Sequence, residues 1–139
     1  MKNLKTICAY AGKRGRQICL EPLNRFETDF INTCDQGLKM IRDVGSSALK
    51  LHLDTFHMNI EEKNQPAAVR KAGKLLAHLH ACGCDRGTPG NDMTYLPACS
   101  TIKTGAVPTG FSMGVAPRGM YAWRTLLSLI VRPHFSKRW

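Results

Sequence analysis

No uninterrupted apolar stretch in this sequence approaches the roughly 20 residues that a membrane-spanning helix requires, so we expect no membrane partner. The first residues, MKNLKTICAYAGKRGRQ, also lack the apolar centre of a secretory signal peptide. We therefore expect a cytoplasmic protein, a compartment in which thiols stay reduced. The six cysteines are accordingly predicted to be free thiols: Cys8, Cys19, Cys34, Cys82, Cys84 and Cys99.

Acidic residues are missing from the last third of the chain. All ten lie between Glu21 and Asp92, whereas residues 93–139 contain six Lys and Arg but no Asp or Glu. Ordinary usage would place about five acids there, so this basic tail differs in composition from what precedes it. The net charge of +10 invites a nucleic-acid interpretation, but the tail's charges are scattered rather than gathered on one helix face. We therefore do not expect nucleic acid as a partner. A basic nucleic-acid-binding chain stays open only as an alternative.

The remaining composition suits one modest domain with a core, since 43% of the 139 residues are hydrophobic. Residues 1–92 alternate between helical and extended spacing, which is typical of βα units and predicts an α/β fold with a parallel sheet. Residues 93–119 show no clear period, and residues 120–131 are predicted as one helix. Three helices are predicted before the tail. The first ends near Arg14, the second runs from a Thr33 cap to Val44 and stops at Gly45, and the third has Pro66 in its first turn. The extended stretches are residues 17–21, 48–54 and 75–80.

Each of the three predicted strands ends in a residue that can bind a metal ion. QICLE ends at Glu21, LKLHLD at Asp54 and LLAHLH at His80, with separations of 33 and 26 residues that suit a repeated βα unit. In a parallel sheet these strand ends lie at the same edge. Two carboxylates and one imidazole favour Mg²⁺, Mn²⁺ or Co²⁺ over a thiolate zinc site. We therefore predict a divalent-metal site of Glu21, Asp54 and His80.

Two structural alternatives compete with that prediction. A single carboxylate at the end of a strand is more often a helix cap or part of a salt bridge, and Arg86 alone would more often be a solvated surface charge. A rival zinc site is offered by HLHACGC, whose His78, His80, Cys82 and Cys84 share one face of an extended strand. Residues on one face of a strand are about 6.6 Å apart, so four of them cannot surround one zinc ion while the strand stays extended.

Three longer motifs carry a family resemblance. EPLNRFETDFINT (21–33), LHLDTFHMNIEE (51–62) and HLHACGCDRGTPG (78–90) resemble the ketose 3-epimerases, the D-tagatose and D-psicose 3-epimerase group of xylose-isomerase-like (β/α)₈ barrels. The resemblance covers residues 1–92 and leaves residues 93–139 unmatched. It implies a partial TIM barrel of about three βα units, followed by a divergent tail.

The resemblance also implies roles for individual residues. Glu21, Asp54 and His80 fall on three of that family's four metal-ligand positions. In such enzymes the metal polarises the C2 carbonyl of a ketose, one carboxylate removes the C3 proton, and a second carboxylate returns a proton on the opposite face. Glu21 would be one of this catalytic pair, and no organic cofactor is needed. The positions that contact the sugar hydroxyls are Glu27, His57 and Arg86.

The sequence departs from the family where the second catalytic carboxylate is expected. That residue should be a Glu beyond residue 92, where no acid exists, and the first four strands of the barrel are also absent. We therefore expect a truncated sugar epimerase of impaired activity, with exposed sheet edges that favour a homo-oligomer. Another barrel sugar isomerase and a non-functional fragment stay open as alternatives.

Overall fold

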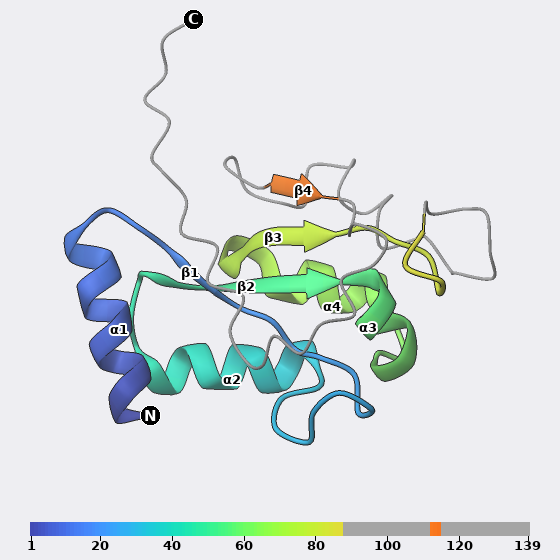
Figure 1. The fold of residues 1–139 in the computed structure, drawn as a ribbon, viewed down its shortest axis with the longest axis horizontal. Coiled ribbons are helices and arrows are strands. Elements are labelled where there is room, and N and C mark those ends of the chain that lie inside the picture. Colours follow the sequence, from blue (N-terminus) through green and yellow to red (C-terminus); the bar gives the residue numbers. More distant parts are fainter. Residues whose placement is uncertain (88–111, 115–139) are drawn as a thin grey trace, which may run out of the picture.

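The described chain folds around a parallel sheet of four strands (Figure 1). The computed structural model describes residues 1–87 and 112–114. All neighbouring strands pair in parallel, in the order β1-β2-β3-β4. The prediction of an α/β fold with a parallel sheet is therefore confirmed. The strands are β1 (Ile18–Leu20), β2 (Leu49–Asp54), β3 (Leu76–His80) and β4 (Ser112–Gly114).

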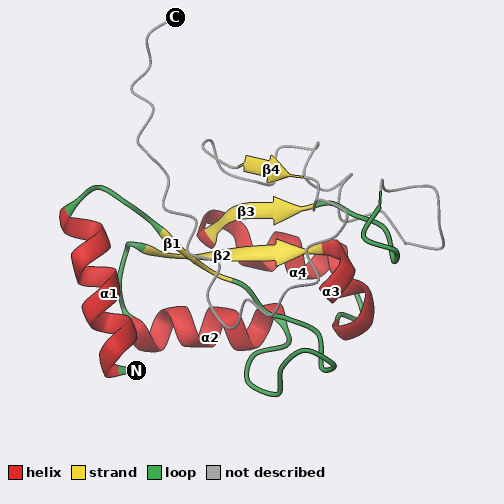
Figure 2. Ribbon diagram, in the orientation of Figure 1, coloured by secondary structure: helices red, strands yellow, loops and turns green. Residues whose placement is uncertain are grey.

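Helices precede and separate the first three strands, as Figure 2 shows in red. The second helix in the chain lies against strand β2 and contacts the fourth helix. The third helix contacts both strand β2 and the fourth helix. A short 3₁₀ turn, Gly73–Leu75, leads into β3. The helices are α1 (Lys2–Lys13), α2 (Cys34–Val44), α3 (Thr55–Glu61) and α4 (Gln65–Ala72).

Local signals in the sequence set the ends of α2. The Thr33 side chain accepts a hydrogen bond from the Gln36 backbone N–H, while the Gln36 side chain accepts one from the Thr33 backbone, which completes a capping box. Gly45 ends the helix in the left-handed conformation, at φ 70°, which favours glycine. The predicted bounds of this helix are therefore confirmed.

The core lies between β2 and the helices. Leu49, Leu51 and Leu53 are at most 1% exposed and belong to the main apolar cluster. On α2, Gly37 permits a close approach, because a Cβ there would lie 2.7 Å from Leu51 Cδ1. The alternate residues of β2 are polar: Lys50 is partly buried, His52 is 0% exposed and Asp54 is 2% exposed. One face of β2 thus packs on helices, and the other holds buried chemistry-bearing side chains.

Two elements escaped the sequence prediction. Helix α3 begins directly after β2, and β4 lies within residues 93–119, where no period is visible. The helix predicted over residues 120–131 lies outside the described residues. Within the described part of the chain, no helix has both the length and the apolarity that a bilayer span requires. Five predicted free thiols are confirmed, and Cys99 also lies outside the described ranges.

Candidate metal and sugar site

The three predicted metal ligands lie at one edge of the sheet. Glu21 follows β1, Asp54 ends β2 and His80 ends β3, so parallel pairing brings them to the same edge. Asp54 and His80 are register partners, and His80 Nδ1 is 3.4 Å from Asp54 Oδ2. Glu21, Asp54 and His57 form a group whose ligand atoms lie within 4.8 Å of one another. Asp54 therefore adjoins both Glu21 and His80.

The two carboxylate oxygens of Asp54 have different surroundings. Oδ1 accepts hydrogen bonds from the Phe56 backbone N–H at 2.8 Å and from the Cys82 thiol at 3.1 Å. Asp54 is thus the N-cap of α3, the structural role that competes with metal binding at a strand end. Oδ2 faces His80 instead. One carboxylate therefore caps a helix and still presents an oxygen toward the predicted metal site.

Burial and local donors act in opposite directions on the Asp54 carboxyl group. Burial raises the pKa of Asp54, but His80, the Phe56 N–H and the Cys82 thiol together lower it below its ordinary value. Burial also raises the pKa of Cys82, to about 12, so its thiol remains protonated and acts as the donor. Asp54 is consequently a carboxylate at neutral pH.

Glu21 is mostly buried, with 14% of its side chain exposed. Its Oε2 is 3.3 Å from His52 Nδ1, and its Oε1 is 3.9 Å from His57 Nε2. Burial acts to raise the pKa of Glu21, but the neighbouring imidazoles of His52 and His57 together bring this pKa below its ordinary value. Glu21 is therefore ionised at neutral pH and can accept a proton or a cation.

The hydrogen bonds of His57 fix its tautomer. His57 Nδ1 accepts from the Asn24 backbone N–H at 3.1 Å, and only an unprotonated nitrogen can accept. Burial lowers the pKa of His57, which agrees with a neutral ring. Its proton must therefore reside on Nε2, the nitrogen that faces Glu21. In this state His57 is a hydrogen-bond donor, which suits contact with a sugar oxygen better than metal ligation.

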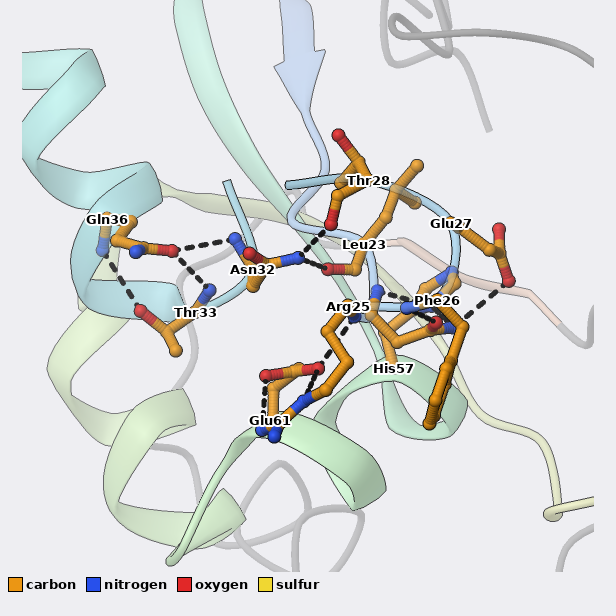
Figure 3. Close-up of polar contacts among 11 residues, drawn as sticks. Leu23, Arg25, Phe26, Glu27, Thr28, Asn32, Thr33, Gln36, His57 and Glu61 are labelled. Atoms are coloured by element: carbon orange, nitrogen blue, oxygen red, sulfur yellow. Dashed lines mark hydrogen bonds and ion pairs between the residues drawn. The ribbon is translucent and has the colours of Figure 1, made fainter. Parts of the chain in front are cut away.

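Asn24, which the sequence analysis did not single out, positions two of the predicted sugar contacts. It is 2% exposed, and its Nδ2 donates to Glu27 Oε1 at 3.0 Å. Its Oδ1 accepts from the Phe26 N–H at 2.9 Å. Figure 3 shows the loop after β1 bringing His57 and Glu27 close together. The only sequence signal was its place inside EPLNRFE, between Glu21 and Glu27.

Arg86 crosses the site from the loop after β3. Its Nη2 is 2.6 Å from Glu27 Oε1, and its guanidinium lies 4.0 Å from the centre of the Phe56 ring. Arg86 also has a φ of 59°, an uncommon conformation for a residue other than glycine. The two predicted sugar contacts Glu27 and Arg86 are thus paired with each other. Arg86 is held by this ion pair and by the Phe56 ring, so it is no freely solvated charge.

The rival four-residue zinc site does not form among the described residues. The Cys82 thiol donates to Asp54, and Cys84 is exposed. The groups in the described ranges that could hold a metal contain only His, Asp and Glu: Glu21, Asp54 and His57 in one, and His52, His78 and His80 in the other. His80 therefore adjoins Asp54 but is grouped with two further histidines.

Known proteins share this fold and its motifs. A family described as "Xylose isomerase-like TIM barrel" matches residues 1–113. A D-psicose 3-epimerase of Agrobacterium fabrum is 42% identical over 90 residues, which are 65% of this chain and 31% of that protein. An L-ribulose 3-epimerase of Mesorhizobium japonicum is 43% identical over 84 residues, 60% of this chain and 28% of that protein.

A solved structure gives the same picture. The D-psicose 3-epimerase of Clostridium cellulolyticum H10, crystallised with D-tagatose, superposes with a TM-score of 0.74 at 35% identity. The match covers 81% of this chain and 39% of that one. The chain spans about a third of the length of the curated relatives it matches. By its sheet, its motifs and the extent of the match, this chain belongs to the xylose isomerase-like TIM barrel family.

Proposed function

We propose that this chain binds a divalent cation through Glu21, Asp54 and His80 and acts on the C3–H bond of a ketose. The observation that carries the proposal is the convergence of two ionised carboxylates, the buried Asp54 and the mostly buried Glu21, at one sheet edge, where an imidazole adjoins Asp54. The relatives support the substrate class, because they include D-psicose and L-ribulose 3-epimerases. One of the similar structures was determined in the presence of D-fructose.

The residues present fit a divalent metal. The negative charges of Glu21 and Asp54 repel each other, which acts to raise the pKa of Glu21. A cation between them would offset this repulsion at a site where water is largely excluded. Carboxylate oxygens with one imidazole suit Mn²⁺, Mg²⁺ or Co²⁺. When bound, such an ion supplies Lewis-acid polarisation of the sugar carbonyl.

The chain's own side chains supply proton transfer and orientation. Glu21 is ionised and partly exposed, so its carboxylate can accept the C3 proton and hold it. The Nε2–H of His57 is the donor for a sugar oxygen on which negative charge develops. Glu27 and Arg86 exchange their mutual ion pair for contacts with sugar hydroxyls.

Inversion at C3 needs a second carboxylate on the opposite face of the sugar. No Asp or Glu occurs in residues 93–139, where the resemblance places that residue. We therefore expect Glu21 to return the proton to the face from which it came. The net result is exchange of the C3 hydrogen with solvent, without formation of the epimer.

Incubation of D-fructose and D-tagatose with the chain and Mn²⁺ in D₂O tests this function. NMR should show deuterium at C3 with no epimer, and both a chelator and Glu21→Gln should abolish the exchange. Formation of the C3 epimer would contradict the proposed single-carboxylate chemistry. Absence of exchange in a chain that binds Mn²⁺ would favour the non-functional fragment, and turnover of a different aldose or ketose would favour another sugar isomerase.

Association between copies is a further part of the proposal. In the sheet formed by the described residues, β1 and β4 are the outer strands. Outer strands present backbone donors and acceptors that a second copy can pair with. Sedimentation equilibrium over a range of concentrations should therefore show species larger than the 15.4 kDa monomer. A monomer throughout would remove the oligomer from the proposal.

A further inference from the structure

Three imidazoles converge on one face of the sheet, below the strand ends. His52 and His78 are register partners on β2 and β3, and His80 lies two residues beyond His78 on the same face. The ring centres are 4.7 Å apart for His52 and His78, 4.3 Å for His52 and His80, and 4.8 Å for His78 and His80. One ring nitrogen of each lies within 4.8 Å of the others. The backbone register alone therefore gathers three nitrogen ligands.

Two of these histidines have a carboxylate beside Nδ1. His80 Nδ1 is 3.4 Å from Asp54 Oδ2, and His52 Nδ1 is 3.3 Å from Glu21 Oε2. Histidines that bind metal ions commonly have such a carboxylate at the other ring nitrogen, which orients the ring and makes it a stronger ligand. The arrangement leaves Nε2 of each ring to face away from its carboxylate.

His52 gives a separate sign that a ligand is missing. It is 0% exposed, its Nε2 has no hydrogen-bond partner among the described residues, and its Nδ1 has only the 3.3 Å contact with Glu21 Oε2. A buried polar atom without a partner destabilises the folded state. Its ring meets both other imidazoles edge-on. A metal ion held by the three rings would satisfy one of these nitrogens.

We propose that His52, His78 and His80 form a second metal site, which takes a borderline transition ion such as Zn²⁺. Three imidazoles with an open fourth position are a known zinc arrangement, with Zn–N distances of about 2.0–2.1 Å. Such distances place ligand nitrogens about 3.4 Å apart in a tetrahedron, so modest ring rotations close the present separations. Imidazole nitrogens favour Zn²⁺, Cu²⁺ or Ni²⁺, whereas the oxygen-rich pair Glu21 and Asp54 favours Mn²⁺ or Mg²⁺.

The two sites share His80, so they compete for it. An ion held by the three histidines takes Nε2 of His80 and leaves its Nδ1 as a hydrogen-bond donor to Asp54, so His80 is no longer a ligand at the site of the proposed function. Zn²⁺ should therefore weaken Mn²⁺ binding, although His80 is the one ligand that the two proposed sites have in common. The proposal of the histidine site does not depend on the proposed function, because its test measures bound Zn²⁺ and Co²⁺ rather than a reaction.

X-ray absorption at the zinc edge, on the full chain with one equivalent of Zn²⁺, tests the site directly. The expected result is three imidazoles per zinc ion, and Co²⁺ in its place should give the intense visible bands of a tetrahedral ion. One or two imidazoles per zinc ion would overturn the proposal, because the carboxylate site, with His57 and His80 beside it, supplies no more than two. This measurement uses the unaltered chain and so does not depend on a variant that folds.

A matched pair of variants assigns the ligands. His78→Gln removes a histidine that belongs only to the second site, and His57→Gln removes one that belongs only to the first group. Removal of a residue that only hydrogen-bonds to a metal ligand lowers metal affinity by about 10- to 100-fold. Removal of the ligand His78 itself should therefore lower Zn²⁺ affinity by at least this factor. His57→Gln should leave Zn²⁺ affinity unchanged, and Mn²⁺ binding, followed by EPR, reports on the first site separately. Equal Zn²⁺ affinity in the His78→Gln variant and the unaltered chain would overturn the assignment.

Discussion

His80 Nδ1 lies 3.4 Å from Asp54 Oδ2, across the register pair that joins the ends of β2 and β3. The contact links the two central strands at the edge where the predicted metal ligands gather. Asp54 raises the pKa of His80 above its ordinary value of 6.5, against the opposing effect of partial burial. Below this raised pKa, a cation that binds through Asp54 and His80 must therefore displace a proton from His80.

The affinity for Mn²⁺ should depend on pH through His80. Above the raised pKa of His80 the ring is neutral and binding needs no deprotonation; below it, one proton is released for each ion bound. Apparent affinity should then fall by about tenfold per pH unit as the pH drops below that pKa. The carboxylates of Asp54 and Glu21 stay ionised over this range because their pKa values are lowered. EPR titrations from pH 5.5 to 8.5 measure this; an affinity that is constant over this range would exclude His80 as a ligand.

In the metal-free chain, the contact between His80 and Asp54 should make the free energy of unfolding fall as the pH rises, whereas the affinity for Mn²⁺ rises. A raised pKa in the folded state means that the folded chain holds the His80 proton more tightly than the unfolded chain. The stabilisation is therefore complete below the unfolded pKa near 6.5 and is lost as the pH rises through the folded pKa. Urea unfolding of the unaltered chain and of His80→Gln, with chelator present, should show this loss only in the former. The same pH dependence in both chains would contradict the assignment to His80.

The tautomer of His57 is a direct prediction of its contact with Asn24. The proton should reside on Nε2, and the ring should titrate below 6.5, because burial lowers the pKa of His57. Long-range ¹H–¹⁵N correlation spectra distinguish the two tautomers, and His57→Gln assigns the signals. A proton on Nδ1 would contradict the donor role proposed for Nε2 toward the sugar.

Gly37 should be intolerant of a side chain, whereas Gly12 should accept one. In Gly37→Ala the new Cβ would lie 2.7 Å from the buried Leu51 Cδ1, and overpacking of this kind costs about 1–3 kcal/mol. In Gly12→Ala the nearest atom is at 3.5 Å, an ordinary contact, so the better helix former should stabilise α1 by about 0.5–1 kcal/mol. Denaturant unfolding measures both changes. Equal effects of the two substitutions would contradict the close packing of α2 on β2.

The sequence predicted the features of the fold and of the site that depend on interactions between residues close together in the chain, or on a repeated pattern. The ends of α2 were predictable because Thr33, Gln36 and Gly45 act within one turn of the chain. The strand ends Glu21, Asp54 and His80 were predictable because the βα unit repeats and parallel pairing returns each end to the same edge. In both cases the signal is local or periodic.

The features that escaped prediction depend on distant contacts. Helix α3 has seven residues without an apolar period, and its cap is the same Asp54 that was read as a metal ligand. The three residues of β4 pair with β3 across more than 30 positions of sequence. Asn24 and His52 are polar residues buried by tertiary contacts, which composition and spacing do not reveal. The alternation of His52 with the leucines of β2 predicted the strand. It did not predict that His52 lies beside His78 and His80 of the neighbouring strand.

The central claim is that Glu21, Asp54 and His80 form a divalent-metal site in the folded chain. A thermal melt followed by circular dichroism, with and without Mn²⁺ at about 100 times its dissociation constant, tests it most directly. Binding to the folded state alone then contributes about 2.7 kcal/mol, which raises the Tm of a domain of this size by roughly 10 °C. Glu21→Gln should abolish the shift, whereas the exposed Asp43→Asn, which removes the same charge away from the site, should retain it. A cooperative transition that Mn²⁺ leaves unmoved, or no cooperative transition in either condition, would contradict the account.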